Sequence, residues 1–365
     1  MARPPDSGRD RCRSDATADD VTSDTPVQLT ERVIAMGASA GGVEALRAVV
    51  AGLPADLPAA VLVVLHIPTR SPSALPGILD RAGPLPAQPA MHGVRMRQGT
   101  IYVAPADHHL LIRDGHLNLS VGPAENGHRP AIDPLFRSAA VAYGAGAVGV
   151  VLSGARDDGS AGLTVIVERG GQAVVQDPEE ALHRSMPASA LEHIETAHVL
   201  PAAKIGVLLG ELVRERLPQL ERSSANAQLA AENEIAALAP VTTDAVQSAR
   251  SSGFSCPSCH GVLFELDGEP APRYRCRVGH AWSPGSLAAK QTSEVDQALW
   301  VALRTLEENA AMNHRLAEVA ARRERHRAAA LYQQRFQSSK TEAARLRELI
   351  ARISAVLQGA PNNGS

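Results

Sequence analysis

The sequence predicts an α/β fold with a doubly wound, mostly parallel sheet of the Rossmann-like kind, followed by a small C-terminal zinc-ribbon-like module and a long helical tail. Short apolar runs alternate with helical patterns over residues 30–215, and three cysteines and a histidine gather within residues 253–285. Residues 286–358 contain neither glycine nor proline. Hydrophobic residues make up 44% of the chain but aromatic ones only 3%, so the core is aliphatic, as buried parallel sheets require. With 365 residues, the chain is long enough for two or three domains without disulfides.

Residues 1–29 are rich in Asp, Ser, Thr, Pro and Arg and predict a disordered arm. The elements that follow, over residues 30–215, alternate between strand and helix, which predicts βαβ units and a sheet covered on both faces. The turn Asp114-Gly115 predicts a hairpin. Strands are expected at 33–36, 60–66, 100–104, 109–113, 116–120, 147–152 and 172–176, and helices at 43–53, 134–143 and 160–169.

The C-terminal 150 residues divide into four parts. Residues 216–252 are polar and predict a linker that is helical in part, and residues 253–285 form the Cys/His module. A single helix over residues 286–358 would exceed about 100 Å, which favours a helical hairpin or a coiled coil. Residues 359–365 are expected to be a disordered C-terminus.

Three polar residues follow predicted parallel strands. Ser39 lies in Gly37-Ala38-Ser39-Ala40-Gly41, a G-x-S-x-G turn that typically lifts a serine above a sheet edge. The N–H groups that follow, at Ala40 and Gly41, open a helix and could stabilise an oxyanion. The same turn also fits a phosphate-binding or merely tight strand–helix connection.

His66 ends the second apolar run, and an acidic pair follows the strand 147–152. A histidine and an acid at the edge that carries Ser39 would complete a Ser–His–acid set. The acid is Asp158, with Asp157 a competitor on spacing alone; a helix N-cap is the alternative role for either. The order Ser, His, Asp differs from that of α/β-hydrolases, so the sequence predicts convergent chemistry on another doubly wound fold.

Residues 31 to about 205 resemble the catalytic domain of the chemotaxis protein-glutamate methylesterases. The resemblance rests on six ordered segments: 37–46 (GASAGGVEAL), 65–68 (LHIP), 99–107 (GTIYVAPAD), 128–140 (HRPAIDPLFRSAA), 150–163 (VVLSGARDDGSAGL), and 176–178 with 185–190 (QDP and SMPASA). It implies Ser39 as nucleophile, His66 as base and Asp158 as acid. It further implies hydrolysis of glutamate γ-methyl esters on chemoreceptors, deamidation of certain glutamines, and no catalytic cofactor.

The resemblance also suggests residues that contact the substrate. His128 and Arg129 lie in a matched segment and are candidates to line the substrate groove, although a solvated loop fits them equally well. Ala155 stands where the family usually has methionine. If this position acts through its backbone N–H, alanine serves as well; if its side chain shapes the pocket, the substrate fit changes. The family's full-length enzyme begins with a receiver domain, and residues 1–29 resemble none, so we expect a stand-alone form controlled by a separate regulator.

The three cysteines in the C-terminal half and a nearby histidine predict a metal site. Cys256, Cys259, Cys276 and His280 have the spacing of a tetrahedral Zn²⁺ site, and a structural role is expected because four protein ligands leave no open position. A small module with free thiols is the alternative. Cys12 stands apart near the N-terminus.

The sequence also bears on location and partners. No run of about 18 apolar residues and no signal-peptide core occur, so a cytoplasmic location is expected. A net charge of −3 argues against nucleic-acid binding by bulk electrostatics. Beside the leading hypothesis of a methylesterase, a second hypothesis is a non-enzymatic signalling scaffold, and a third is a protein whose basic tail binds DNA. The tail fits a solvated helix pair, docking to an acidic receptor bundle, or self-association.

Overall fold

The computed structural model describes residues 31–67, 73–217, 227–239, 250–266 and 272–359. The N-terminal arm, most of the predicted linker and residues 360–365 of the predicted C-terminal tail lie outside the described residues.

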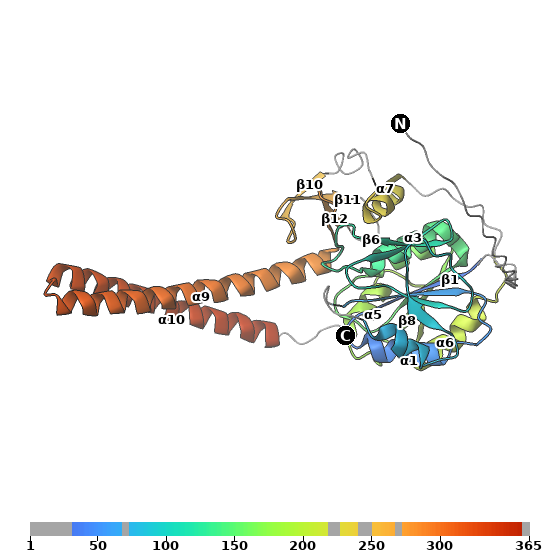
Figure 1. The fold of residues 1–365 in the computed structure, drawn as a ribbon, viewed down its shortest axis with the longest axis horizontal. Helices are drawn as coiled ribbons and strands as arrows, with labels where there is room; N and C mark the ends of the chain where they lie inside the picture. Colours follow the sequence, from blue (N-terminus) through green and yellow to red (C-terminus); the bar gives the residue numbers. More distant parts are fainter. Residues whose placement is uncertain (1–30, 68–72, 218–226, 240–249, 267–271, 360–365) are drawn as a thin grey trace, which may run out of the picture.

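A seven-stranded parallel sheet forms the centre of the molecule (Figure 1). Every neighbouring pair in the order β3-β4-β2-β1-β7-β8-β9 is parallel, which confirms the predicted α/β class. The middle strands β1 and β2 are buried along their whole length, as their unbroken apolar sequences require. The strands are β1 (Val33–Ala38), β2 (Ala60–Leu65), β3 (Ala87–Pro89), β4 (Ile101–Val103), β7 (Ala147–Val151), β8 (Gln172–Gln176) and β9 (His198–Leu200).

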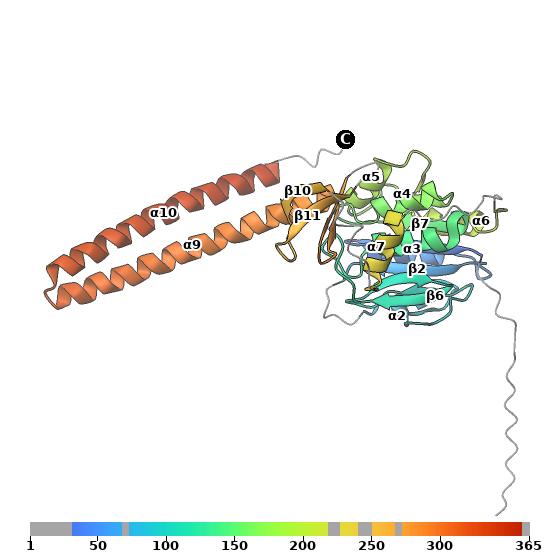
Figure 2. The same cartoon turned by 90° about the horizontal axis from the view of Figure 1, so that it is seen from above.

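Helices cover both faces of this sheet (Figures 1 and 2). Alternate residues of β1 point to opposite faces, so Ile34 and Met36 join one apolar cluster while Val33 and Ala35 join the other. The first cluster is closed by α1 (Gly42–Ala51), α2 (Leu75–Asp80) and α6 (Ala202–Leu212). The second is closed by α3 (Ile132–Tyr143), α4 (Ser160–Glu168), α5 (Ser185–Leu191) and a hairpin of β5 (His109–Arg113) and β6 (His116–Ser120).

Several elements differ in detail from expectation. The β5–β6 hairpin closes on Asp114 and Gly115, both at positive φ, as predicted, but the preceding strand β4 joins the main sheet. Helix α3 begins at Ile132, two residues before the expected start, because Pro134 is tolerated in a first helical turn. Strands β3 and β9 are three residues each, too short to give a period in the sequence.

A second, antiparallel sheet carries the cysteines and lies beside α7 (Ala227–Ala236) (Figure 1). Its order is β10-β11-β12-β13, and its small core includes Leu263, Trp282 and Leu287 with two of the cysteines. The first strand begins at Arg250, three residues before the expected module boundary. The strands are β10 (Arg250–Ser255), β11 (Val262–Leu266), β12 (Arg273–Cys276) and β13 (Ala281–Trp282).

Two long helices follow, α9 (Pro284–Arg322) and α10 (His326–Gly359), and run away from the sheets side by side (Figures 1 and 2). They pack through Leu303, Ala343 and Ile350, flanked by Leu299, Leu306 and Leu346. Residues 299, 303 and 306 lie on one face of α9 at the spacing of a coiled-coil seam. Ser283 caps α9 by accepting the Ser286 N–H. Among the described helices, none is long and apolar enough to cross a membrane.

Candidate active site

Ser39, His66 and Asp158 meet at the carboxyl edge of the parallel sheet. Ser39 follows β1, His66 follows β2, and Asp158 lies on the loop after β7; β1 pairs with both other strands. His66 Nδ1 lies 3.1 Å from Ser39 Oγ, and His66 Nε2 lies 2.7 Å from Asp158 Oδ2. In the neutral ring this arrangement puts the proton on Nε2, where it is donated to Asp158, and leaves Nδ1 to accept from the Ser39 hydroxyl.

The turn that presents Ser39 is held by the neighbouring loop. Ser39 N–H donates to Ser153 O at 2.9 Å, and Ser153 Oγ donates to Ala40 O at 2.8 Å. Gly41 has φ +70°, and a Cβ there would lie 2.8 Å from both Ser153 Oγ and Leu182 Cβ. Glycine is therefore needed at this turn for both backbone conformation and space.

Asp158 is a buried, charged acceptor. It is 1% exposed and accepts from Ile132 N–H at 2.7 Å and Asn126 Nδ2 at 2.9 Å, besides His66. Burial alone would raise its pKa, but the hydrogen bond and charge of His66 and the Ile132 N–H outweigh burial and lower the pKa of this carboxyl well below its usual range. Asp158 is thus ionised and able to orient and stabilise an imidazolium.

A second buried carboxyl, that of Asp133, lies next to Asp158. Asp133 accepts from Gly159 N–H at 3.1 Å, from Gly162 N–H at 2.7 Å and from Asn126 Nδ2 at 3.0 Å. Burial, and then the negative charge of Asp158, raise the pKa of Asp133 to about 8. The pKa values of the two carboxyls therefore differ widely, and Asp158, which faces His66, is the one that keeps its charge.

Asp157, the competitor on sequence spacing, faces away from the histidine. Its Oδ1 accepts from Ser283 Oγ at 2.7 Å and from Ser286 Oγ at 2.5 Å, at the start of α9. The geometry therefore selects Asp158 as the acid partner of His66 and gives Asp157 a contact with the C-terminal part.

His128 lies flat on the imidazole of His66. The two ring centroids are 3.7 Å apart and the planes differ by 6°. Burial and the neighbouring His66 lower the pKa of His128 to about 4, so its ring is neutral at pH 7. A neutral ring stacked in this way limits how far the His66 ring can tilt.

The side chain of Arg129 bonds to neighbouring loops. Its guanidinium contacts Asp107 Oδ1 at 2.9 and 2.6 Å and donates to the carbonyls of Val121 and Gly122 at 3.0 Å each. These contacts tie two loops together, so the side chain supports the loop that carries His128.

Three backbone N–H groups in the segments next to Ser39 are without backbone acceptors among the described residues. The loop after β7 passes close to Ser39, since a Cβ on Gly154 would lie 3.0 Å from Ser39 Cβ, and the next residue, Ala155, is exposed. Within the described parts of the chain, the N–H groups of Ala40, Gly41 and Ala155 make no backbone hydrogen bond, so they can donate to a bound oxygen.

The four predicted metal ligands also meet. Ligand atoms of Cys256, Cys259, Cys276 and His280 all lie within 4.8 Å of one another. Cys259 Sγ is 3.6 Å from Cys276 Sγ, which is 3.5 Å from His280 Nδ1. Thiolates bound to zinc at about 2.3 Å in a tetrahedron would be separated by about 3.8 Å, so the donor set fits this ion.

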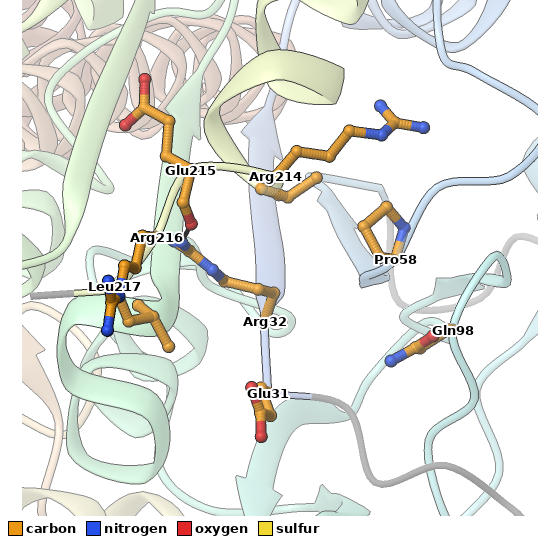
Figure 3. A pocket seen from close by; sticks show the side chains of 9 residues that line it. Glu31, Arg32, Pro58, Gln98, Arg214, Glu215, Arg216 and Leu217 are labelled. Atoms are coloured by element: carbon orange, nitrogen blue, oxygen red, sulfur yellow. Dashed lines mark hydrogen bonds between the residues drawn. The ribbon is translucent and has the colours of Figure 1, made fainter.

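One hollow, of about 810 Å³, lies away from these residues. Its lining includes Arg32, Pro58 and Gln98, which precede β1, β2 and β4, and residues 213–217 after α6 (Figure 3). It therefore lies at the amino ends of the strands, opposite the Ser39 edge. Parallel α/β sheets place their chemistry at the carboxyl ends, so this hollow is not the active site.

Comparison with known proteins identifies the family of the domain that carries these residues. Residues 34–209 match the sequence profile described as CheB methylesterase. This part of the chain belongs to the CheB methylesterase family.

Two relatives of this CheB-type chain are named protein-glutamate methylesterase/protein-glutamine glutaminase 2. One, from Anaeromyxobacter dehalogenans, is 40% identical over 182 residues, covering 50% of this chain and 53% of that protein. The other, from Xanthomonas oryzae pv. oryzae, is 38% identical over 180 residues, covering 48% of this chain and 50% of that protein. The chain thus spans about half the length of these curated relatives. It is also similar to the crystal structure of the Thermotoga maritima CheB methylesterase catalytic domain, with 33% identity, a TM-score of 0.48, and coverage of 50% of this chain and 98% of that one.

Sequence reasoning on this CheB-type domain missed Asn126, Asp133 and Gln176. Asp133 lies inside a matched segment, but an acid in a first helical turn ordinarily indicates a helix-dipole contact. Gln176 accepts Ser153 N–H at 2.8 Å and so supports the loop that holds the serine turn. No local pattern distinguishes Asn126 from an ordinary turn residue.

Proposed function

We propose that this protein is a serine hydrolase that removes methyl groups from glutamate γ-methyl esters on chemoreceptor-type signalling proteins. The observation that carries the proposal is the continuous chain of contacts from Ser39 Oγ through His66 to Asp158. The names of its relatives support the same chemistry.

In the proposed reaction, His66 Nδ1 takes the Ser39 proton as Ser39 Oγ attacks the ester carbonyl carbon. Asp158 stabilises the imidazolium through Nε2–H. The N–H groups of Ala40, Gly41 and Ala155 receive the oxyanion, next to the positive end of α1. Because Ala155 would act through its backbone, a residue without a long side chain serves there.

The tetrahedral intermediate then collapses. The C–O bond to the methoxy group breaks, His66 Nδ1–H protonates the leaving oxygen, and methanol departs. His66 then deprotonates a water molecule, whose oxygen attacks the acyl carbon. The bond from that carbon to Ser39 Oγ breaks, and His66 returns the proton to Ser39 Oγ. The same steps with an amide would release ammonia from glutamine, which is the deamidation we also propose.

His128 is proposed to restrict the His66 ring at the rim of the substrate site. Its neutral state at pH 7 avoids placing a second positive charge against the imidazolium that forms during the reaction.

The C-terminal module is proposed to hold one structural Zn²⁺ on Cys256, Cys259, Cys276 and His280. The ion would supply folding energy to a unit whose own core is small. Metal analysis should find one zinc per chain. The Cys276→Ser variant should lose the zinc. The Cys12→Ser variant, which changes the one cysteine outside the proposed site, should keep it. Zinc retention in Cys276→Ser would argue against this ligand set.

The proposed activity is tested by methanol release from a methylated receptor fragment. Wild type should release methanol and Ser39→Ala should not, with both proteins showing the same circular dichroism spectrum. Equal release by the two would reject the hydrolase and favour a binding or scaffold role for the domain.

A further inference from the structure

The loop 125–128 lies between the active site and the Cys/His module. Glu125 and His128 exchange backbone hydrogen bonds in both directions, and Asn126 and Gly127 complete a tight turn at φ +52° and +79°. Asn126 is 3% exposed although it stands at the tip of a turn, because the module covers it. The side chain of a buried asparagine must find partners at both ends of its amide.

Those partners belong to two different parts of the protein. Asn126 Nδ2 donates to Asp158 Oδ1 at 2.9 Å and to Asp133 Oδ2 at 3.0 Å. Asn126 Oδ1 accepts the backbone N–H of Ser283, at 2.8 Å, from the module. The reverse orientation would set the amide oxygen against two carboxyls and the amide nitrogen against an N–H donor. The two carboxyls and the Ser283 N–H of the module therefore act together to fix which end of this amide faces Asp158.

The module is firmly attached at this point. Asn126 N–H donates to Ala281 O at 2.8 Å, and Trp282, 1% exposed, lies against Gly127, where an added Cβ would be 3.3 Å from its ring. The hydroxyls of Ser283 and Ser286 donate to Asp157, the neighbour of Asp158. Residues 281–286 thus form one continuous strip, which we call the docking strip, against the loops that carry the acid.

Buried charges reinforce the same contact. Glu125, 2% exposed, accepts from Arg137 of α3 at 2.8 Å and from Arg275 of β12 at 3.1 Å. Burial would raise the pKa of Glu125, but the two arginines lower it overall, so the carboxylate stays charged. Removing the module would leave this charge cluster without Arg275, and separating a buried pair is costly.

We propose that Asn126 is a positioning residue for Asp158, and that the docking strip of the Cys/His module holds Asn126 in its working orientation. The rate of ester cleavage then depends on a module that contributes no group to the reacting atoms. This inference rests on the proposed hydrolase function and adds to it the residue through which the C-terminal part acts.

The test compares Ser283→Pro with Ser283→Ala in the full chain. Ser283 has φ −75°, which proline adopts, and follows a strand residue, so proline removes the N–H donor without demanding a new backbone conformation. Both variants lose the hydroxyl contact with Asp157. They differ because only Ser283→Pro lacks the N–H that Asn126 Oδ1 accepts, and only its ring displaces the Asn126 amide.

Activity is expressed per functional serine. A fluorophosphonate titrates Ser39, and turnover is measured on a peptide with a glutamate γ-methyl ester. Ser283→Pro should have kcat about 10-fold below that of Ser283→Ala, with KM unchanged, because the acid is less well held. The acid limb of its kcat/KM profile should move to lower pH, since a poorly oriented Asp158 stabilises the charged imidazole less. A general loss of folding would instead lower the number of titratable serines and leave the limb in place.

The same pair in an Asn126→Ala background shows whether the effect passes through the amide. Asn126→Ala alone should lower kcat per serine, and Ser283→Pro should then add nothing to Ser283→Ala. Equal kcat per serine for the two Ser283 variants, or an undiminished difference between them in the Asn126→Ala background, would overturn the inference.

Failure of the proposed function is separable from failure of this inference. If wild type reacts with fluorophosphonate at Ser39 but releases no methanol, the substrate is wrong. The rate of Ser39 labelling then takes the place of turnover in the same comparison. If Ser39 does not label in wild type, the hydrolase and the positioning role fall together.

Discussion

Replacing Asp158 with asparagine tests the triad geometry because the two side chains have the same shape. The carboxylate accepts from donors on both oxygens: His66 Nε2 and Ile132 N–H on Oδ2, and Asn126 Nδ2 and Asp133 N–H on Oδ1. An asparagine offers one oxygen and one NH₂ group, so two of these donors must face another donor.

The effect on stability should be moderate, because part of its cost is offset for a reason visible in the structure. Donors left unpaired in the interior cost about 1–3 kcal/mol each. The substitution also removes a negative charge that raises the pKa of Asp133, and that relief offsets part of the cost. The variant should therefore fold, and its Asp133 should titrate at a lower pH than in wild type.

The effect on turnover should be large. With an NH₂ group on the Oδ2 side, the imidazole is driven to the tautomer that carries its proton on Nδ1, which faces Ser39 and can no longer accept the hydroxyl proton. With the NH₂ group on the other side, the imidazolium loses its charged partner. We expect kcat to fall by about 10³- to 10⁴-fold, or about 4–5.5 kcal/mol of transition-state stabilisation.

The assay is methanol release per serine titrated with fluorophosphonate, with circular dichroism to establish folding. Asp157→Asn is the matched control: it removes the same charge one residue away, where the partners are the hydroxyls of Ser283 and Ser286, and should change kcat less than about 10-fold. A folded Asp158→Asn protein with kcat within about 10-fold of wild type would refute the role given to this carboxylate.

Two further predictions concern pH and packing. Because the pKa of His128 falls from its ordinary 6.5 to about 4 on folding, the unfolded chain binds a proton between these pH values that the folded chain does not. The free energy of unfolding should therefore fall as the pH drops through this window, by about 2 kcal/mol at pH 5. Urea unfolding at pH 7 and at pH 5 measures this loss, and His128→Gln should remove the part that His128 causes. A Cβ on Gly37 would lie 2.4 Å from Ile132 Cγ2, so Gly37→Ala should lower the free energy of unfolding by about 1–3 kcal/mol and reduce turnover by displacing the residue that donates to Asp158. Gly77→Ala, in helix α2 with only Arg81 Nη1 at 3.4 Å, should instead raise stability by about 0.5–1 kcal/mol; the same sign for both variants in thermal unfolding would contradict this packing argument.

The sequence by itself determined the parallel sheet, the positions of Ser39 and His66, and the grouping of three cysteines with one histidine. Each of these is encoded locally. An unbroken apolar run such as Ala60–Leu65 indicates a strand buried on both faces, and polar residues just after such runs must gather at one edge of a parallel sheet. Ligand spacing within two short turns likewise needs no knowledge of distant parts.

Only the tertiary structure showed what holds Asp158 against the imidazole and which partners Asp157 has instead. On spacing alone, Asp157 and Asp158 were equivalent, and the resemblance named Asp158. The structure places Asp158 on His66 and Asp157 on the hydroxyls of Ser283 and Ser286. For Arg129 the sequence left a substrate groove and a loop role open, and the structure places its guanidinium on Asp107, since loop packing, not residue type, fixes where a long side chain goes. Asn126 and Ser283 are 157 positions apart, and no period or motif links them. Contacts of this kind arise when two folded units dock, and the pairing of buried polar groups across the contact then sets the chemistry at the sheet edge.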